Sequence, residues 1–186
     1  MIRLDLSFSN ELFVCLDTET TGLGFADEVC QLGVVNFNQE FLFDELIRPT
    51  IPIPEAATAI HHITNSDVQN KQGISYWWDS LMGTTLYQKV IIGYNVFYDI
   101  RMLMQSIQKA DNGFKRKSLN PIAVVDVMQL YQKTYNSTKW MKLNEACEAR
   151  EIKPIDRKFH DASFDSYMTM GLFKQIMKDR VGMKNV

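Results

Sequence analysis

Residues 12–23 read LFVCLDTETTGL, and this stretch decides the fold. Its first five residues, Leu12 to Leu16, are all apolar, which is typical of a buried central β-strand. Asp17 and Glu19 follow at once, and because they are two residues apart their side chains point the same way in an extended chain. Two neighbouring carboxylates are costly unless a cation or a proton lies between them. The stretch therefore predicts a buried strand with a charged site at its end.

The rest of the chain places further strands and helices around this one. Two β-rich runs, 29–37 and 40–47, are split by Asn38-Gln39, which predicts a hairpin, and short strands are expected at 90–93 and 122–125. Helices are expected at 56–61, 74–87, 97–110, 127–135, 142–150 and 162–179. Ser66 is expected to cap a short turn before Val68, and Asn95 is the candidate cap of the helix at 97–110. Three strands followed by alternating strands and helices predict an α/β fold, a mixed central β-sheet with helices on both faces.

Length and composition restrict the class of protein. The 186 residues, with no internal repeat or linker, are expected to form a single domain over 1–186. The net charge of −2 argues mildly against a protein that coats DNA, but little against an enzyme that binds a few phosphates through metal ions. Three widely spaced cysteines predict free thiols. With no apolar stretch of about 20 residues and no signal peptide, we expect a cytoplasmic protein without a membrane partner.

Two more acids lie in apolar patterns. Asp99 precedes Met102 and Leu103 by three and four residues, and Asp165 precedes Met168 by three, so each acid shares the inward face of a predicted helix. One such acid usually complements the helix dipole. Four acids from three separate segments instead indicate a shared cation. Oxygen ligands without a suitable Cys/His cluster favour Mg²⁺ or Mn²⁺.

His160 lies five residues before Asp165. On one helix that spacing separates two side chains by about 140°, so His160 is expected to precede the helix, on a loop. There it could accept a proton from water near neutral pH. The alternative is a surface histidine at a helix start.

These residues form a recognisable set of motifs. The segments are DTETTGL at 17–23, GYNVFYD at 93–99, HDASFD at 160–165, QLGVV at 31–35 and IHHIT at 60–64, with Asp126 opening a further one. In this order and spacing the chain, from 13 to about 176, resembles the DnaQ-like, or DEDDh, 3′→5′ exonucleases, and most of all the exonuclease X and polymerase-proofreading members of that family. Tyr94 and Tyr98 depart from it, since the family often has His and Phe there.

The resemblance implies an RNase H-like fold and a 3′→5′ exonuclease that releases nucleoside 5′-monophosphates. Its catalytic residues would be the four acids Asp17, Glu19, Asp99 and Asp165, which bind two divalent cations, Mg²⁺ or Mn²⁺, and His160 as general base. The expected partner is the 3′ end of a nucleic acid, with DNA favoured over RNA. A polymerase or a second copy of the chain could be a further partner.

Five residues are predicted to contact the substrate: Thr20, Gly22, Leu23, His61 and Tyr98. An apolar residue and a glycine directly after two metal ligands suggest that the loop from Thr20 to Leu23 holds the terminal nucleotide, with Leu23 beside the base. Tyr98 could stack on a base or sugar. The resemblance implies that His61 touches substrate, and the alternative is a histidine that satisfies a turn.

Two other functions remain open from the sequence. An RNase H-like endonuclease would share the acids and metals but would not need a pocket for a terminal nucleotide. A non-catalytic module that binds nucleic acid or a polymerase would not need all four acids and His160.

Overall fold

The apolar run ahead of the two acids forms the central strand of the sheet. In the computed structural model, which describes residues 9–111, 119–156 and 159–183, five strands are ordered β3-β2-β1-β4-β5. On one side of β1 (Phe13–Thr20), β2 (Val29–Asn36) pairs antiparallel with β1 and β3 (Phe41–Leu46) pairs antiparallel with β2. On the other side, β4 (Val90–Gly93) and β5 (Ala123–Asp126) run parallel to β1. The sheet is therefore mixed, as predicted.

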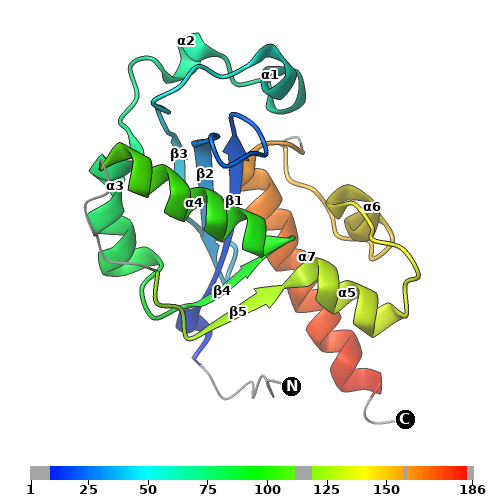
Figure 1. Ribbon diagram of the computed structural model, residues 1–186. Coiled ribbons are helices and arrows are strands. Elements are labelled where there is room, and N and C mark those ends of the chain that lie inside the picture. The colour runs from blue at the N-terminus through cyan, green and yellow to red at the C-terminus, as the bar shows by residue number, and fades with distance from the viewer. Residues whose placement is uncertain (1–8, 112–118, 157–158, 184–186) are drawn as a thin grey trace.

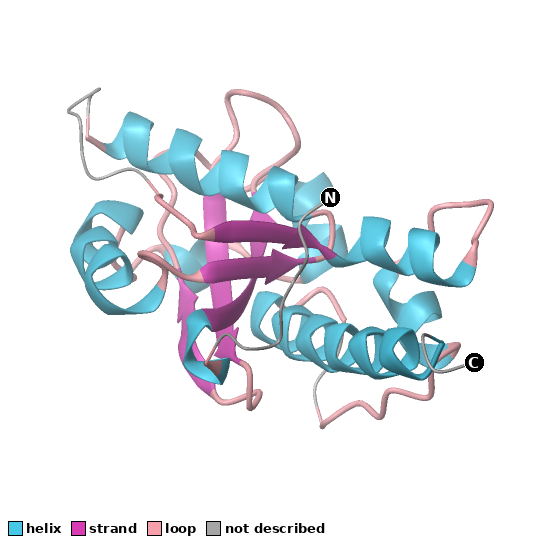
Figure 2. Ribbon diagram, turned by 90° about the horizontal axis from the view of Figure 1, so that it is seen from below, coloured by secondary structure: helices cyan, strands magenta, loops and turns pink. Residues whose placement is uncertain are grey.

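Two long helices cover the two faces of the sheet. α4 (Val96–Ala110) lies across one face and α7 (Ala162–Met183) across the other, an arrangement that Figures 1 and 2 both show. The remaining helical segments are η1 (Asn10–Leu12), α1 (Glu55–His61), α2 (Asn65–Val68), α3 (Ile74–Ser80), η2 (Leu81–Thr85), α5 (Val127–Tyr135) and α6 (Leu143–Glu148). Among the described residues, no helix combines the length and the apolar character needed to cross a membrane.

The side chains of β1 alternate between two cores. Phe13 and Cys15 pack with α7, whereas Val14 and Leu16 pack with α3 and α4. All three cysteines are buried and free, as predicted. A strand that is apolar on both faces is typical of a sheet covered on both sides, so β1 cannot be displaced without disturbing both cores.

Three local predictions were wrong in detail. The predicted helix over 74–87 is α3 followed by a π-helical turn, η2. Ser66 does not cap α2, because Thr64 is its N-cap and forms a capping box with Asp67. Asn95 does precede α4, but it is left-handed, with φ 61°, and its side chain makes no capping bond.

Candidate active site

The end of β1 divides its polar residues between the two faces of the sheet. Because side chains alternate, Asp17 and Glu19 share the α7 face with Cys15, and Thr18 shares the α4 face with Leu16. The two predicted acids of β1 thus point toward the segment that carries His160 and Asp165. Thr18 points toward the helix that carries Asp99.

Asp99 is held against β1 by Thr18. One Asp99 carboxylate oxygen, Oδ1, accepts from the Thr18 backbone N–H at 3.0 Å and from its hydroxyl at 2.7 Å. The turn before α4 is fixed by Asp126, whose Oδ1 accepts from the Asn95 N–H at 3.2 Å and from Met128 N at 3.0 Å at the start of α5. Asp126, which opens the last of the motif segments, is the N-cap of α5.

Asp165 and His160 lie at the N-terminus of α7. Asp161 caps this helix, accepting from the N–H groups of Ser163 and Phe164 at 3.1 Å each. His160 precedes the helix on a loop, as predicted, in a left-handed conformation with φ 68°. Its backbone N–H donates to Asp165 Oδ2 at 3.2 Å, and its ring is exposed.

Gly33 allows α7 to approach the sheet closely enough to form this site. A Cβ atom at Gly33 would lie 2.4 Å from the backbone of Ala162 and Ser163. Gln31, on the same face of β2, accepts from the Ala162 N–H at 3.1 Å, and the Ser163 hydroxyl donates to Asp44 at 2.5 Å. The QLG segment therefore docks the start of α7, and this docking brings Asp165 to Asp17 and Glu19.

The gathered carboxyl groups hold their protons strongly in the absence of a cation. Burial, followed by Asp99, Asp165 and Glu19 as neighbouring charges, raises the pKa of Asp17 well above its usual range. Burial and nearby acids raise the pKa of Glu19 to about 8. Burial also raises the pKa of Asp99 and that of Asp165 to about 7, against hydrogen bonds from Thr18 and from His160.

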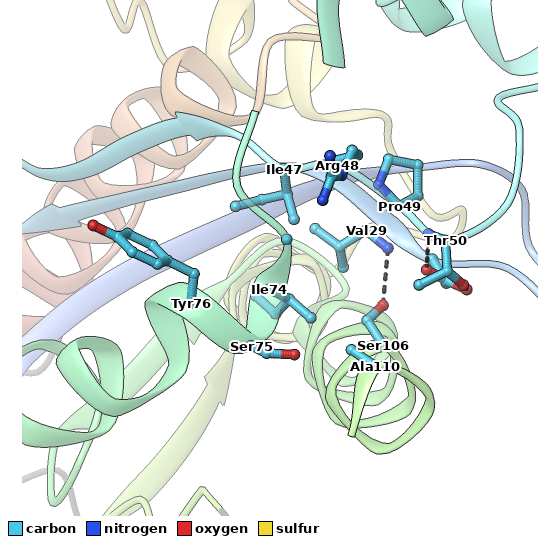
Figure 3. A pocket seen from close by; sticks show the side chains of 12 residues that line it. Val29, Ile47, Arg48, Pro49, Thr50, Ile74, Ser75, Tyr76, Ser106 and Ala110 are labelled. Atoms are coloured by element: carbon cyan, nitrogen blue, oxygen red, sulfur yellow. Dashed lines mark hydrogen bonds between the residues drawn. The ribbon is translucent and has the colours of Figure 1, made fainter. Parts of the chain in front are cut away.

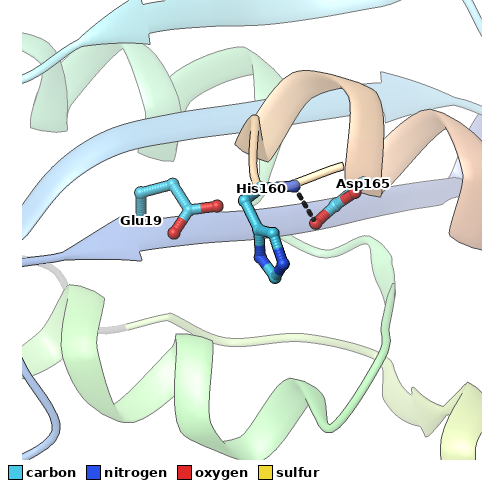
Figure 4. A group of neighbouring side chains, drawn as sticks. All are labelled: Glu19, His160 and Asp165. Atoms are coloured by element: carbon cyan, nitrogen blue, oxygen red, sulfur yellow. Dashed lines mark hydrogen bonds between the residues drawn. The ribbon is translucent and has the colours of Figure 1, made fainter. Parts of the chain in front are cut away.

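The residues present fit a divalent cation. Glu19, His160 and Asp165 each offer a ligand atom, and these atoms lie within 4.8 Å of one another, with the His160 ring between the two carboxylates (Figure 4). Asp165 Oδ1 is buried and has no hydrogen-bond partner among the described residues, so a cation would satisfy it. Asp17 and Asp99 lie outside this tight group, and the nearby charge of Asp99 contributes to the raised pKa of Asp17.

Most of the predicted substrate residues are engaged within the protein. The hydroxyl of Thr20, which is buried, lies 2.7 Å from the Tyr98 hydroxyl and donates to Gly22 O at 2.9 Å. Tyr98 also donates to Gly22 O at 3.0 Å. A Cβ at Gly22 would lie 2.7 Å from Asp27 Oδ2. Tyr98, at a position where the family often has Phe, therefore ties α4 to the loop after β1.

His61 is buried and uses both ring nitrogens within the chain. Its Nδ1 accepts from the Ile63 N–H at 3.1 Å, so Nε2 carries the proton and donates to Thr20 O at 3.3 Å. Burial lowers the pKa of His61, which agrees with a neutral ring. This geometry favours the turn-satisfying alternative. Contact between His61 and substrate stays a prediction.

Leu23 is the exposed member of the predicted set, with 79% of its surface accessible. The sequence reasoning missed its companion Phe25, which is 85% exposed, and the way their loop is held. Arg101 donates to Leu23 O at 3.2 Å, and its guanidinium lies 5.4 Å from the Phe25 ring centroid and 5.2 Å from that of Tyr98. Gln105 donates to Gly24 O at 3.0 Å.

Two cavities differ in their relation to the acids. One, of about 520 Å³, lies between β2, the 47–50 segment, α3 and α4 (Figure 3), and its polar groups bond to one another: Ser106 accepts from Val29 N at 2.9 Å, and Glu28 accepts from Thr50. Neither the four acids nor His160 is among its lining residues. The other cavity, of about 500 Å³, is lined by His160 and Asp165 and opens beside the acids.

Comparison with known proteins agrees with this arrangement. Residues 14–173 match the family model of the exonucleases named RNase_T. An uncharacterized exonuclease, CP81, of Escherichia phage 186 is 30% identical over 176 residues, 89% of this chain and 88% of that protein. A PolC-type DNA polymerase III of Thermotoga petrophila is 35% identical over 182 residues, but the chain spans 13% of its length.

The fold has solved counterparts. A structure of exonuclease X in complex with 5′-overhanging duplex DNA superimposes with a TM-score of 0.66 at 22% identity, over 89% of this chain and 91% of that one. The mixed sheet with its covering helices is thus the RNase H-like fold of the DnaQ-like exonucleases.

Proposed function

The chain belongs to the RNase_T exonuclease family, a DnaQ-like group of nucleases, and on that premise we propose that it removes nucleotides one at a time from the 3′ end of a nucleic acid. The products are nucleoside 5′-monophosphates. The exonuclease X structure, solved with DNA, supports DNA as the substrate.

One observation carries the proposal: acids from three segments and an exposed histidine converge at the end of β1, where a buried Asp165 oxygen has no hydrogen-bond donor among the described residues. The residues that would hold two divalent cations, Mg²⁺ or Mn²⁺, are Asp17, Glu19, Asp99 and Asp165. Bound there, such ions would activate water and neutralise the charge of the scissile phosphate.

The chain's own residues divide the remaining work. His160, exposed on its loop and anchored through its backbone to Asp165, accepts the proton of the attacking water. Thr18 and Asp161 are positioning residues, because one holds Asp99 and the other caps the helix that carries Asp165. The loop from Thr20 to Leu23 contacts the terminal nucleotide, with Leu23 as its exposed apolar surface.

The test is a labelled-end assay. The purified chain is incubated with Mg²⁺ or Mn²⁺ and with single-stranded DNA or RNA that is labelled at the 3′ or the 5′ end. We expect stepwise loss of the 3′ label as mononucleotide, and loss of that activity in Asp17→Asn and His160→Ala. Absence of degradation of every substrate with either metal contradicts the proposal.

Two controls separate the rival functions. A circular single strand has no end, so its cleavage would indicate an endonuclease. Nuclease activity that is untouched in Asp17→Ala would show that these acids are not its source, and would favour a chain that binds nucleic acid or a polymerase without catalysis.

One relative that is much longer than this chain suggests a partner. The PolC-type relative carries the matching segment within a DNA polymerase, which supports a polymerase as a partner of this chain, with residues 1–186 acting as a single exonuclease domain. Sedimentation of the purified chain alone and with a polymerase tests this, and self-association would instead indicate a homodimer.

A further inference from the structure

The cavity of about 500 Å³ beside the acids has a wall that the proposed mechanism does not use. His160 and Asp165 form its inner edge, and Trp140, Met141 and Lys142 form part of its outer edge. The loop that holds Thr20 and Leu23 contributes no lining residue to this cavity. The proposed site therefore has one surface for a nucleotide on the β1-loop side and a separate hollow on the α6 side.

The outer edge has the composition of a single-strand binding surface. Residues 139–142 read KWMK, and Trp140 is 56% exposed in a loop whose lysines, Lys139 and Lys142, are also exposed. Aromatic rings that stack on bases, flanked by cations that contact the backbone, are the usual means of binding a single strand without sequence preference.

Tyr94 anchors this loop to the catalytic end of the sheet. Its hydroxyl donates to Met141 O at 2.5 Å, and its ring lines the same cavity. Tyr94 directly follows β4, so the bond connects the loop that carries Trp140 to the turn before Asp99. The position of the tryptophan relative to the acids is thus set by the side chain at the site where the family often has histidine.

Resting on the proposed exonuclease function, we propose that this cavity binds the nucleotide on the 5′ side of the scissile phosphate, with Trp140 stacking on its base and Lys139 and Lys142 contacting the backbone. A phosphodiester has a nucleotide on each side, so a phosphate held at the acids needs two places for its neighbours. The Leu23 side receives the terminal nucleotide, and the cavity at His160 and Asp165 receives the one that stays on the strand.

The decisive experiment compares two substrates that differ only on the 5′ side of the cleaved bond. A single-stranded decanucleotide fills both places. The 5′ p-nitrophenyl ester of thymidine monophosphate has the terminal nucleotide but carries nitrophenol in place of the rest of the strand. For Trp140→Ala we expect the KM of the decanucleotide to rise roughly 5- to 150-fold, the range that the loss of one stacked base implies. The kcat/KM of the ester should be unchanged.

Matched variants separate stacking, charge and folding. Trp140→Phe should recover most of the KM, and Tyr76→Ala, which removes another exposed aromatic from α3, should change neither substrate. Lys139→Gln/Lys142→Gln should lower the slope of log affinity against log salt by about 1.4, the value for two lost single-strand phosphate contacts. Lys133→Gln/Lys178→Gln removes two exposed lysines that do not line the cavity and should leave the slope unchanged.

Tyr94→Phe tests the anchor. Because it keeps the ring and loses the bond to Met141, we expect a higher KM for the decanucleotide with little change in kcat, and no change for the ester. A kcat loss on both substrates would instead make Tyr94 a support of Asp99 and contradict its role as anchor of the loop.

Equal loss of both substrates in Trp140→Ala, or no loss of either, overturns the assignment of the cavity. A wild-type chain that cleaves neither substrate overturns the proposed function instead. In that case the assignment of the cavity is tested by binding alone, measured as fluorescence anisotropy of the labelled decanucleotide. Trp140→Ala must still bind it more weakly than the wild type.

Discussion

Thr18 lies between Asp17 and Glu19 in β1, yet its hydroxyl donates to Asp99, on the opposite face of the sheet. It donates to Asp99 Oδ1 at 2.7 Å while its own backbone N–H donates to the same oxygen. Hydrogen bonds to a charged group are worth about 1.5–3 kcal/mol. The residue between the acids of the DTE segment is therefore part of the site.

Replacing Thr18 by valine should weaken the site without unfolding the protein. Thr18→Val keeps the β-branched shape in a buried strand but removes one donor from the Asp99 carboxylate, so we expect activity at limiting Mn²⁺ to fall at least about 10-fold. The measurement is an Mn²⁺ activation curve together with Tm. Thr18→Ser should recover most of the activity, and unchanged activation in Thr18→Val would remove Asp99 from the metal shell.

The carboxyl groups also predict how pH affects stability. Their folded pKa values, about 8 for Glu19 and about 7 for Asp99 and Asp165, exceed the value of about 4 for unfolded carboxyls. The folded chain therefore binds more protons than the unfolded chain between about pH 4 and 8, and its free energy of unfolding falls as pH rises through this window when metal is removed. Mn²⁺ at 100 times its Kd should restore about 2.7 kcal/mol, and it should do so more fully at pH 8 than at pH 5, because protons compete less.

Thermal unfolding at pH 5, 6.5 and 8, with EDTA or Mn²⁺, measures this dependence. Glu19→Gln/Asp165→Asn removes two of the groups and should flatten the metal-free curve relative to the wild type. A wild-type Tm that rises more steeply with pH than that of the variant would show that these carboxyls are not the cause.

At the scale of elements, the site depends on how two helices dock. The start of α7 lies close enough to the sheet to place Asp165 in the site only because β2 has no side chain at Gly33. α4 carries Asp99 into the site and also binds the loop after β1. Three side chains on one stripe of α4, Arg101, Gln105 and Lys109, donate to backbone carbonyls of residues 23–27.

Gly33→Ala should separate the two halves of the site. Its Cβ would meet the Ala162 and Ser163 backbone at 2.4 Å, and overpacking of this kind costs about 1–3 kcal/mol. The start of α7 must move, and a displacement of about 1 Å at the reacting groups can cost about 100-fold in rate. We therefore expect nuclease activity to fall about 100-fold while the chain still folds, as measured by kcat/KM and circular dichroism.

Gly83→Ala is the matched control, since a Cβ there meets no atom within 4 Å. It should retain full activity. Retention of activity in Gly33→Ala would show that the close approach of α7 to β2 is not required for catalysis.

Removing the three α4 side chains that donate to this loop should make the loop that carries Leu23 and Phe25 more mobile. In Arg101→Ala/Gln105→Ala/Lys109→Ala the loop carbonyls lose their donors, so amide hydrogen exchange over 22–27 should accelerate. The KM for single-stranded DNA should rise at least about 5-fold, the equivalent of about 1 kcal/mol. Gln108→Ala, on an exposed position of the same helix, should change neither quantity, and unaltered exchange in the triple variant would show that the stripe does not order the loop.

At the scale of the whole molecule, β1 belongs to both cores and to the site. Its apolar half packs with α7 on one face and with α3 and α4 on the other, and its polar end carries Asp17, Thr18 and Glu19. The near-zero net charge of the chain is compatible with the proposed nuclease function. The proposed cations and the KWMK loop would supply positive charge only where the nucleic-acid strand binds.

This sharing predicts a single cooperative unfolding transition. Neither core can open without β1. In Trp140→Phe the remaining tryptophans, Trp77 and Trp78, both pack in the α3/α4 core, so urea unfolding followed by tryptophan fluorescence should coincide with unfolding followed by far-ultraviolet circular dichroism. Loss of the tryptophan signal ahead of the loss of helix would mean that the α4 face unfolds separately, and that residues 1–186 are not one cooperative domain.

The sequence by itself determined the fold class, the candidate acids and the family resemblance. A period of two along β1, a period of three to four on the faces of Asp99 and Asp165, and the five-residue spacing from His160 to Asp165 are all local properties of the chain. Backbone geometry translates such spacings directly into faces of strands and helices, so the mixed sheet, the loop position of His160 and the candidate acids could be predicted without coordinates.

Only the tertiary structure decided which side chains are already engaged. Thr20, His61 and Tyr98 match the pattern of substrate residues, yet their polar atoms bond to one another or to nearby backbone, whereas Trp140, Phe25 and Arg101 carry no motif and lie at the edge of the site. Thr18, the donor to Asp99, lies 81 positions from it in the sequence. The β2 segment around Gly33 lies about 130 positions from the start of α7 that packs against it. Hydrogen-bond partners and close packing depend on the meeting of distant segments, and no periodicity within one segment encodes that meeting.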